Sequence, residues 1–159
     1  MQKELNTLKQ YFGFTDFREN QKDVIHSISK GKDVLALMPT GGGKSLCYQV
    51  PALSREGVCI VISPIISLMH DQVQALRKKG IKASLINSTL SPEDQRNAIL
   101  QMINEEVKFI YISPERLKSY EFIEAMKISN ITLVAIDEAH CISQWGHEFR
   151  PEYSKIDMY

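Results

Sequence analysis

The sequence lacks the features that mark membrane, secreted, disordered or fibrous chains. Its longest unbroken apolar run is about five residues, at Val58–Ile62, far short of the roughly twenty that cross a bilayer. The N-terminal stretch MQKELNTLKQ is not a signal peptide. Only 8 of the 159 residues are glycine and 6 are proline, which excludes a collagenous or low-complexity chain. We therefore expect one soluble, intracellular globular domain with no membrane partner.

Cysteine and net charge are also scarce. Cys47, Cys59 and Cys141 form no CxxC pair and lie beside apolar neighbours, which favours buried reduced thiols over disulfides. Cys141 and His147 suggest zinc only weakly, because no further ligands appear at metal spacing. With 19 basic and 19 acidic residues the chain has no net field, so any nucleic-acid contact must be local. The basic run at residues 77–82 fits a solvated helix end.

Apolar strands and amphipathic helices alternate along the chain. Short β-rich runs predict strands at residues 33–38, 58–63, 83–87, 108–113 and 131–136. Helices are predicted at residues 3–11, 18–29, 44–54, 66–79, 92–105 and 120–127. Asp16 is expected to cap the second helix, and Ser91 the fifth, with Pro92 at its first position. The alternation predicts an α/β fold of three layers, a mostly parallel sheet with helices on both faces.

A glycine-rich turn separates the first predicted strand from the helix that follows it. Consecutive glycines allow backbone N–H groups to wrap an anion at the positive end of the helix. Lys44 would reach the β- and γ-phosphates of ATP, and the Ser45 hydroxyl would ligate Mg²⁺. The expected cofactor-binding residues here are Pro39, Thr40, Gly41, Gly42, Gly43, Lys44 and Ser45. The strict GxxxxGK[ST] pattern is missed because Met38 replaces its first glycine, and a plain flexible turn is the alternative.

The strand predicted at residues 131–136 ends in two carboxylates. Asp137 would hold Mg²⁺ and Glu138 would polarise the attacking water. Taken alone, a strand can simply end in exposed acids, but the upstream turn favours the catalytic pair. His140 is either a satisfied buried histidine or a γ-phosphate sensor.

In order along the chain, these segments resemble motifs of superfamily 2 helicases, and in detail the RecQ family of DNA helicases. The resemblance rests on FGFTDFRENQ, PTGGGKS, SPIISLMHDQV, YISPERL and DEAH. CISQWGHEFRPEY, which follows DEAH, is similar to the aromatic-rich loop of RecQ proteins and is not usual in DEAH-box RNA helicases. The resemblance implies that residues 1–159 are the first RecA-like domain, cut before motif III, of an ATP-dependent helicase that moves 3′ to 5′ on DNA. The resemblance of DEAH to a helicase motif also implies that His140 is the γ-phosphate sensor.

Gln21 is a candidate for recognising the nucleotide base. A glutamine amide can donate to one edge atom of adenine and accept from its neighbour, matching N7 and N6. The resemblance implies this role for Gln21, with Phe14 and Arg18 nearby. Without the resemblance, a lone glutamine on a helix is ordinary solvated surface.

Trp145, Phe149 and Arg150 are candidates for nucleic-acid coupling. Gly146 and Pro151 break any continuous helix, so these side chains belong to a loop. Aromatic faces and a guanidinium suit stacking on unpaired bases and holding phosphates, although composition leaves a plain packed loop open. The resemblance implies that the loop couples single-stranded DNA binding to ATP hydrolysis, and that the turns at residues 63–64 and 113–114 contact the DNA backbone.

The resemblance also implies partners and missing parts. The second RecA-like domain of the same polypeptide would supply an arginine finger, so we expect this chain alone to bind nucleotide weakly and barely hydrolyse it. Single-stranded DNA and duplex junctions are the expected nucleic-acid partners, in the cytoplasm, at the nucleoid of a bacterium or in a eukaryotic nucleus. The rival interpretations are a DEAH-type RNA helicase, a small P-loop kinase or switch NTPase, and a nucleotide-insensitive DNA-binding module.

Overall fold

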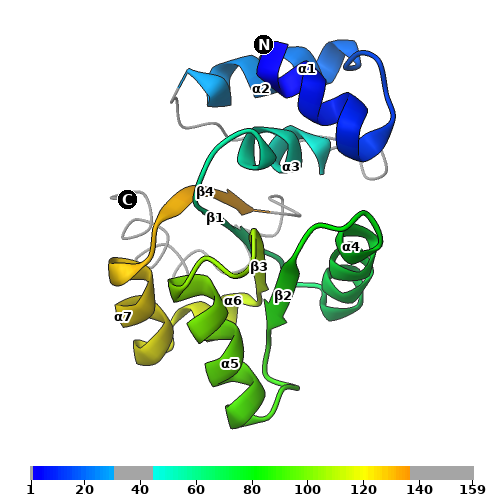
Figure 1. Ribbon diagram of the computed structural model, residues 1–159. Coiled ribbons are helices and arrows are strands. Elements are labelled where there is room, and N and C mark those ends of the chain that lie inside the picture. Colours follow the sequence, from blue (N-terminus) through cyan, green and yellow to red (C-terminus); the bar gives the residue numbers. More distant parts are fainter. Residues whose placement is uncertain (1, 31–44, 137–159) are drawn as a thin grey trace. The chain divides into compact units, whose positions relative to one another are not determined.

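The computed structural model of the chain describes residues 2–30 and 45–136, and it divides into two compact units at residues 1–56 and 57–159 (Figure 1). Each unit has an apolar core of its own. The strand predicted at residues 33–38 lies outside the described residues. Within the described ranges, no helix is long and apolar enough to span a membrane.

The first unit consists of helices. The helix predicted at residues 3–11 is α1 (Gln2–Thr7) followed by a π-helical turn, η1 (Leu8–Phe12), and α2 (Glu19–Ser29) and α3 (Leu46–Leu53) complete the unit. Gly13 ends η1 with a φ of 75°, a left-handed conformation that glycine adopts without strain. The core of this unit contains the buried side chains of Leu8, Phe17, Ile25 and Val50.

The predicted capping of α2 by Asp16 is wrong. Arg18 is the residue that precedes the helix. The Asp16 carboxylate instead accepts a hydrogen bond from the Phe17 N–H at 2.8 Å and pairs with Lys22 at 3.4 Å. Asp16 therefore shapes the approach to the helix, while the capping contact comes from within the first turn of α2.

The second unit contains a parallel sheet of four strands in the order β2-β3-β1-β4. The strands are β1 (Val58–Ile62), β2 (Ala83–Ile86), β3 (Phe109–Ile112) and β4 (Ile131–Ile136), each within one residue of its predicted bounds at either end. Gly57, directly before β1, has a φ of 101°, and a Cβ atom there would lie 3.0 Å from the Asn130 carbonyl oxygen. This close approach of two backbones makes glycine necessary at residue 57.

Helices cover both faces of this sheet, which confirms the predicted layers (Figure 1). The helices are α4 (Ile66–Lys78), α5 (Pro92–Ile103), α6 (Pro114–Leu117) and α7 (Tyr120–Ile128). The chain crosses from β1 to β2 in one direction and from β2 through β3 to β4 in the other. Because parallel crossovers are right-handed, α4 lies on one face and α5 and α7 lie on the opposite face.

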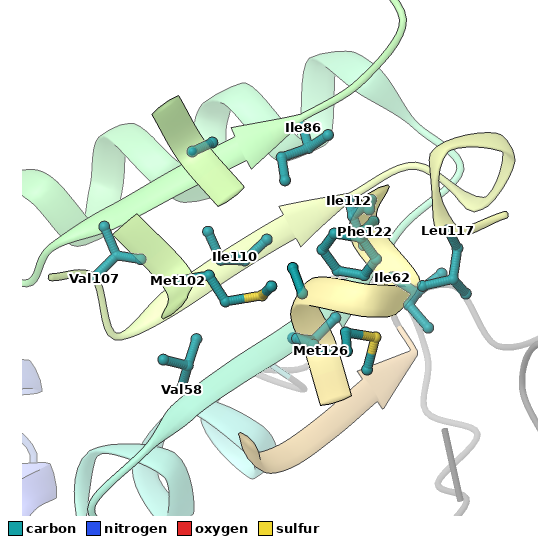
Figure 2. Packing of buried hydrophobic residues seen from close by; sticks show 13 residues of the cluster. Val58, Ile62, Ile86, Met102, Val107, Ile110, Ile112, Leu117, Phe122 and Met126 are labelled. Atoms are coloured by element: carbon teal, nitrogen blue, oxygen red, sulfur yellow. The ribbon is translucent and has the colours of Figure 1, made fainter. Parts of the chain in front are cut away.

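The face under α5 and α7 contains the larger core cluster. Figure 2 shows Met102 of α5 and Phe122 and Met126 of α7 packed toward the strand residues Ile110 and Ile112.

Ser91 caps α5 as predicted, because its hydroxyl oxygen accepts from the Asp94 N–H at 3.1 Å.

Candidate nucleotide and nucleic-acid site

Polar side chains follow three neighbouring strands where these strands end. The pairing register aligns the last strand residues, which are Ile86, Ile112, Ile62 and Ile136. Ser63, Asn87 and Ser113 come next, and they are only 1%, 0% and 2% exposed. Asp137 follows Ile136 in the sequence and lies outside the described residues. The sheet thus has a buried polar edge, which consists of Ser63, Asn87 and Ser113.

This polar edge includes the point where the crossovers diverge. β1 continues into α4 on one face of the sheet, whereas its neighbour β3 continues into α6 and α7 toward the other. The Ser63 N–H joins the two strand ends by donating to the Ile112 carbonyl oxygen at 3.1 Å. Open parallel sheets bind ligands at such a switch point, beyond the carboxyl ends of the strands.

Three polar atoms near this edge have no hydrogen-bond partner within the described part of the chain. They are Asn87 Nδ2, Ser113 Oγ and Arg116 Nε, all buried. The other end of the Asn87 amide is satisfied, because its oxygen accepts from the Thr89 N–H at 2.8 Å and from the Thr89 hydroxyl. A buried polar atom left unpaired costs about 1 to 3 kcal/mol, so such atoms indicate a ligand or bound water. All three can donate, which suits an anionic group such as a phosphate.

Sequence reasoning selected Ser113 but missed Asn87 and Arg116. Asn87 was included in the strand predicted at residues 83–87, whereas β2 ends at Ile86. A signal was available, because a polar residue follows the buried run of β2 as Ser63 follows that of β1. The predicted turn at residues 113–114 opens the short helix α6, which carries Arg116.

Gln21 lies at the start of α2 in the first unit. Its side chain is only 2% exposed, so solvated surface is excluded for this residue. Its side-chain Oε1 atom accepts from the Arg18 backbone N–H at 2.9 Å, and the Gln21 backbone N–H donates to the Arg18 carbonyl oxygen at 2.9 Å. This reciprocal pair caps the helix and fixes the orientation of the amide. Since a carbonyl oxygen has two lone pairs, Oε1 can still accept from the exocyclic amine of adenine.

The other predicted base-binding residues lie close to Gln21 along the chain. Phe14 is 54% exposed, although an apolar ring of this size is usually covered. Arg18 is exposed and directly precedes α2. An uncovered aromatic ring before a buried amide suits stacking on a base whose edge the amide contacts.

Ser45 is the described residue of the predicted phosphate turn. It directly precedes α3, and its carbonyl oxygen accepts from the Gln49 N–H at 2.9 Å, so the helix begins at this residue. The other predicted residues of the turn, the acidic site and the aromatic loop lie outside the described residues: Pro39, Thr40, Gly41, Gly42, Gly43, Lys44, Asp137, Glu138, His140, Trp145, Phe149 and Arg150. Magnesium binding by Ser45 and Asp137 stays a prediction.

The thiols and the basic run have the environments that the sequence predicts. Cys47 and Cys59 are buried and form no disulfide among the described residues, and burial raises the pKa of Cys47 to about 11 and that of Cys59 further. Both are protonated and unreactive near neutral pH. At the end of α4, Arg77 is exposed and donates through Nε to the Ala83 carbonyl oxygen at 3.0 Å. Cys141 lies outside the described residues.

Comparison with known proteins relates the chain to helicases. A family model described as DEAD/DEAH box helicase matches residues 18–158. The probable ATP-dependent DNA helicase RecS of Bacillus subtilis is 51% identical over 157 residues, which cover 98% of this chain and 31% of that protein. The ATP-dependent DNA helicase RecQ of Haemophilus influenzae is 47% identical over 152 residues, covering 96% of this chain and 25% of that protein. The chain thus spans about a quarter to a third of these relatives.

Solved structures share the fold at lower identity. A hypothetical ATP-dependent RNA helicase from Sulfolobus tokodaii matches with a TM-score of 0.72 and 22% identity, covering 98% of this chain and 46% of that chain. The DUF1998 helicase MrfA bound to DNA and AMPPNP matches with a TM-score of 0.66 and 22% identity, covering 88% and 21%. At this identity the likeness is one of fold.

Proposed function

We propose, since the chain belongs to the DEAD/DEAH box helicase family, that it is the first motor domain of a RecQ-type ATP-dependent DNA helicase. In the complete protein, hydrolysis of ATP would drive movement 3′ to 5′ along single-stranded DNA and open duplex junctions. The observation that carries the proposal is the buried polar edge, where three adjacent strands end in buried polar residues at the switch point of the sheet.

The nucleotide would be bound by the residues proposed for base recognition and by the glycine-rich turn, and hydrolysed with the acidic residues that follow β4 in the sequence. The Gln21 amide reads the adenine edge and Phe14 stacks on the base, while the turn before α3 holds the phosphates. Lys44 neutralises charge on the β- and γ-phosphates, and Ser45 and Asp137 are the ligands for Mg²⁺. Bound Mg²⁺ would supply charge neutralisation for the triphosphate. Glu138 orients the attacking water and takes its proton, and His140 senses the γ-phosphate.

The nucleic acid would be held by the second unit. Asn87, Ser113 and Arg116 offer buried donors to backbone phosphates, which position a strand without reading its sequence. Trp145, Phe149 and Arg150 would stack on unpaired bases and couple the strand to hydrolysis. An RNA helicase is not favoured, because the relatives at 51% and 47% identity are named DNA helicases, whereas the RNA helicase among the solved structures is only 22% identical.

The chain by itself would be a poor catalyst. An arginine finger contributed by a second RecA-like domain is worth on the order of 10³ to 10⁵ in rate. Single-turnover hydrolysis by residues 1–159 should therefore be slower than that of the full-length protein by about that factor. Equal rates would show that the active site is complete within this chain.

The proposal is tested by steady-state ATP hydrolysis of the full-length protein without nucleic acid, with single-stranded DNA and with single-stranded RNA. We expect strong stimulation by DNA alone, lost in a Trp145→Ala variant that still binds ATP. Stimulation by RNA would support the DEAH-type RNA helicase instead. Hydrolysis unaffected by either nucleic acid would support a small P-loop NTPase.

A further inference from the structure

Helix α1 is tied to the carboxyl-terminal ends of both α2 and α3. The Thr7 and Ser54 hydroxyls lie 2.9 Å apart, which links α1 to the residue that ends α3. The Ser29 hydroxyl donates to Glu4 Oε1 at 2.9 Å, which links α1 to the last residue of α2. The Arg55 guanidinium, just after α3, donates to the Ile28 carbonyl oxygen of α2, so α2 and α3 are also linked to each other.

The Thr7–Ser54 contact is part of a buried chain of hydrogen bonds. The Thr7 hydroxyl also reaches the Lys3 carbonyl oxygen at 3.0 Å, and the Ser54 hydroxyl reaches the Val50 carbonyl oxygen at 2.8 Å. Two hydroxyl hydrogens thus serve three short contacts, so each hydroxyl constrains the other. Both side chains are buried, which keeps water from replacing the contact.

The ends opposite these links carry the proposed nucleotide-binding residues. Gln21 lies about 12 Å along α2 from Ser29, and Ser45 lies about 14 Å along α3 from Ser54, at 1.5 Å per residue. A rotation of about 5° at the linked ends would therefore move Gln21 or Ser45 by about 1 Å. Displacements of about 1 Å are enough to weaken an aligned binding site.

We propose that α1 is a brace that sets the position of Gln21 relative to Ser45, and that Thr7 is a positioning residue for recognition of the adenine base. This inference rests on the proposed function. The brace acts on a ligand that spans both helices, so it affects the base and the triphosphate together. Triphosphate alone needs only the start of α3, at Ser45, so its affinity does not depend on where α2 lies.

The test uses the full-length protein with Mg²⁺ and competition of ATP, GTP and inorganic triphosphate against a fluorescent ATP analogue. In Thr7→Val, which keeps the side-chain shape but removes the hydroxyl, we expect ATP to bind about fivefold more weakly, the equivalent of one hydrogen bond between Gln21 and the base that is lost when α2 shifts. Triphosphate should change by less than about twofold, so the preference for ATP over triphosphate and over GTP falls. Thr7→Ser should restore both preferences, and Ser54→Ala should reproduce their loss from the other side of the contact.

The matched control is Ile110→Val in the core of the second unit, which lowers stability without touching the brace. Circular dichroism spectra and urea unfolding establish that each variant folds. Unchanged preferences in both Thr7→Val and Ser54→Ala, or an equal loss in Ile110→Val, would overturn the brace and leave the proposed function intact. If the unaltered protein bound ATP no better than GTP or triphosphate, the proposed base recognition itself would be wrong.

Discussion

Replacing Gln21 with methionine separates the two tasks that the structure gives this side chain. Methionine has similar length and fills the same buried space, but it cannot accept from the Arg18 N–H. Loss of a helix-capping contact costs about 1 kcal/mol of unfolding free energy. Loss of two hydrogen bonds to adenine costs about 1 to 3 kcal/mol, or roughly five- to 150-fold in the Kd for ATP.

Guanine keeps the N7 acceptor but presents the O6 acceptor where adenine presents an amine, so it can gain at most one of the two contacts with Gln21 and loses part of it to repulsion between two oxygens. GTP binding should therefore weaken much less than ATP binding in Gln21→Met. Equilibrium titration with ATP and with GTP, beside urea unfolding, measures both effects on one preparation. Gln10→Met is the control, because Gln10 is an exposed glutamine of η1. An equal weakening of ATP and GTP binding, or an unchanged preference, would show that Gln21 only caps α2.

Three further variants test the fold and the site. Gly57→Ala should lose about 2 kcal/mol or more of unfolding free energy in urea, because of its positive φ and the nearby Asn130 carbonyl oxygen; a loss below about 0.5 kcal/mol would contradict this. Lys44→Ala should abolish nucleotide binding in a fluorescence titration at an unchanged melting temperature, and unchanged ATP affinity would refute its role. Burial alone would raise the pKa of Glu4, but hydrogen bonds from its own backbone and from Ser29 hold it below the ordinary value. Its stabilisation is therefore present above the unfolded pKa and lost as pH falls through the folded value, so unfolding of Glu4→Gln should depend less on pH between about 5 and 3.

The sheet could be predicted closely because its inner strands β1 and β3 are buried at every residue. Runs such as Val58–Ile62 are apolar at every residue, and in a chain that alternates strands with helices this pattern is typical of the inner strands of a parallel sheet. Local hydrogen-bond choices were harder to predict. Asp16 is a residue type that favours helix caps, yet Gln21 supplies the cap because its longer side chain folds back onto the backbone of its own helix.

The candidate site, like the fold, could be predicted only in part from the sequence. The motifs indicate which residues bind a nucleotide, since glycine-rich turns and paired acids have specific chemistry. The burial of Gln21, and the lack of a partner for Asn87 Nδ2 among the described residues, could not be predicted, because they depend on what packs around each side chain. Sequence spacing contains no information on those neighbours.

The buried donors of the polar edge have a consequence for the balance between stability and activity. Near Asn87, the Ser113 hydroxyl is held in a dry environment without a partner among the described residues. Ser113→Ala should therefore raise the unfolding free energy by about 1 kcal/mol while weakening the binding of single-stranded DNA. A fold optimised for stability alone would fill this edge with apolar side chains. Under the proposed function, the buried polar residues at the strand ends would keep the domain less stable than its core allows, and binding of a phosphate would satisfy their donors.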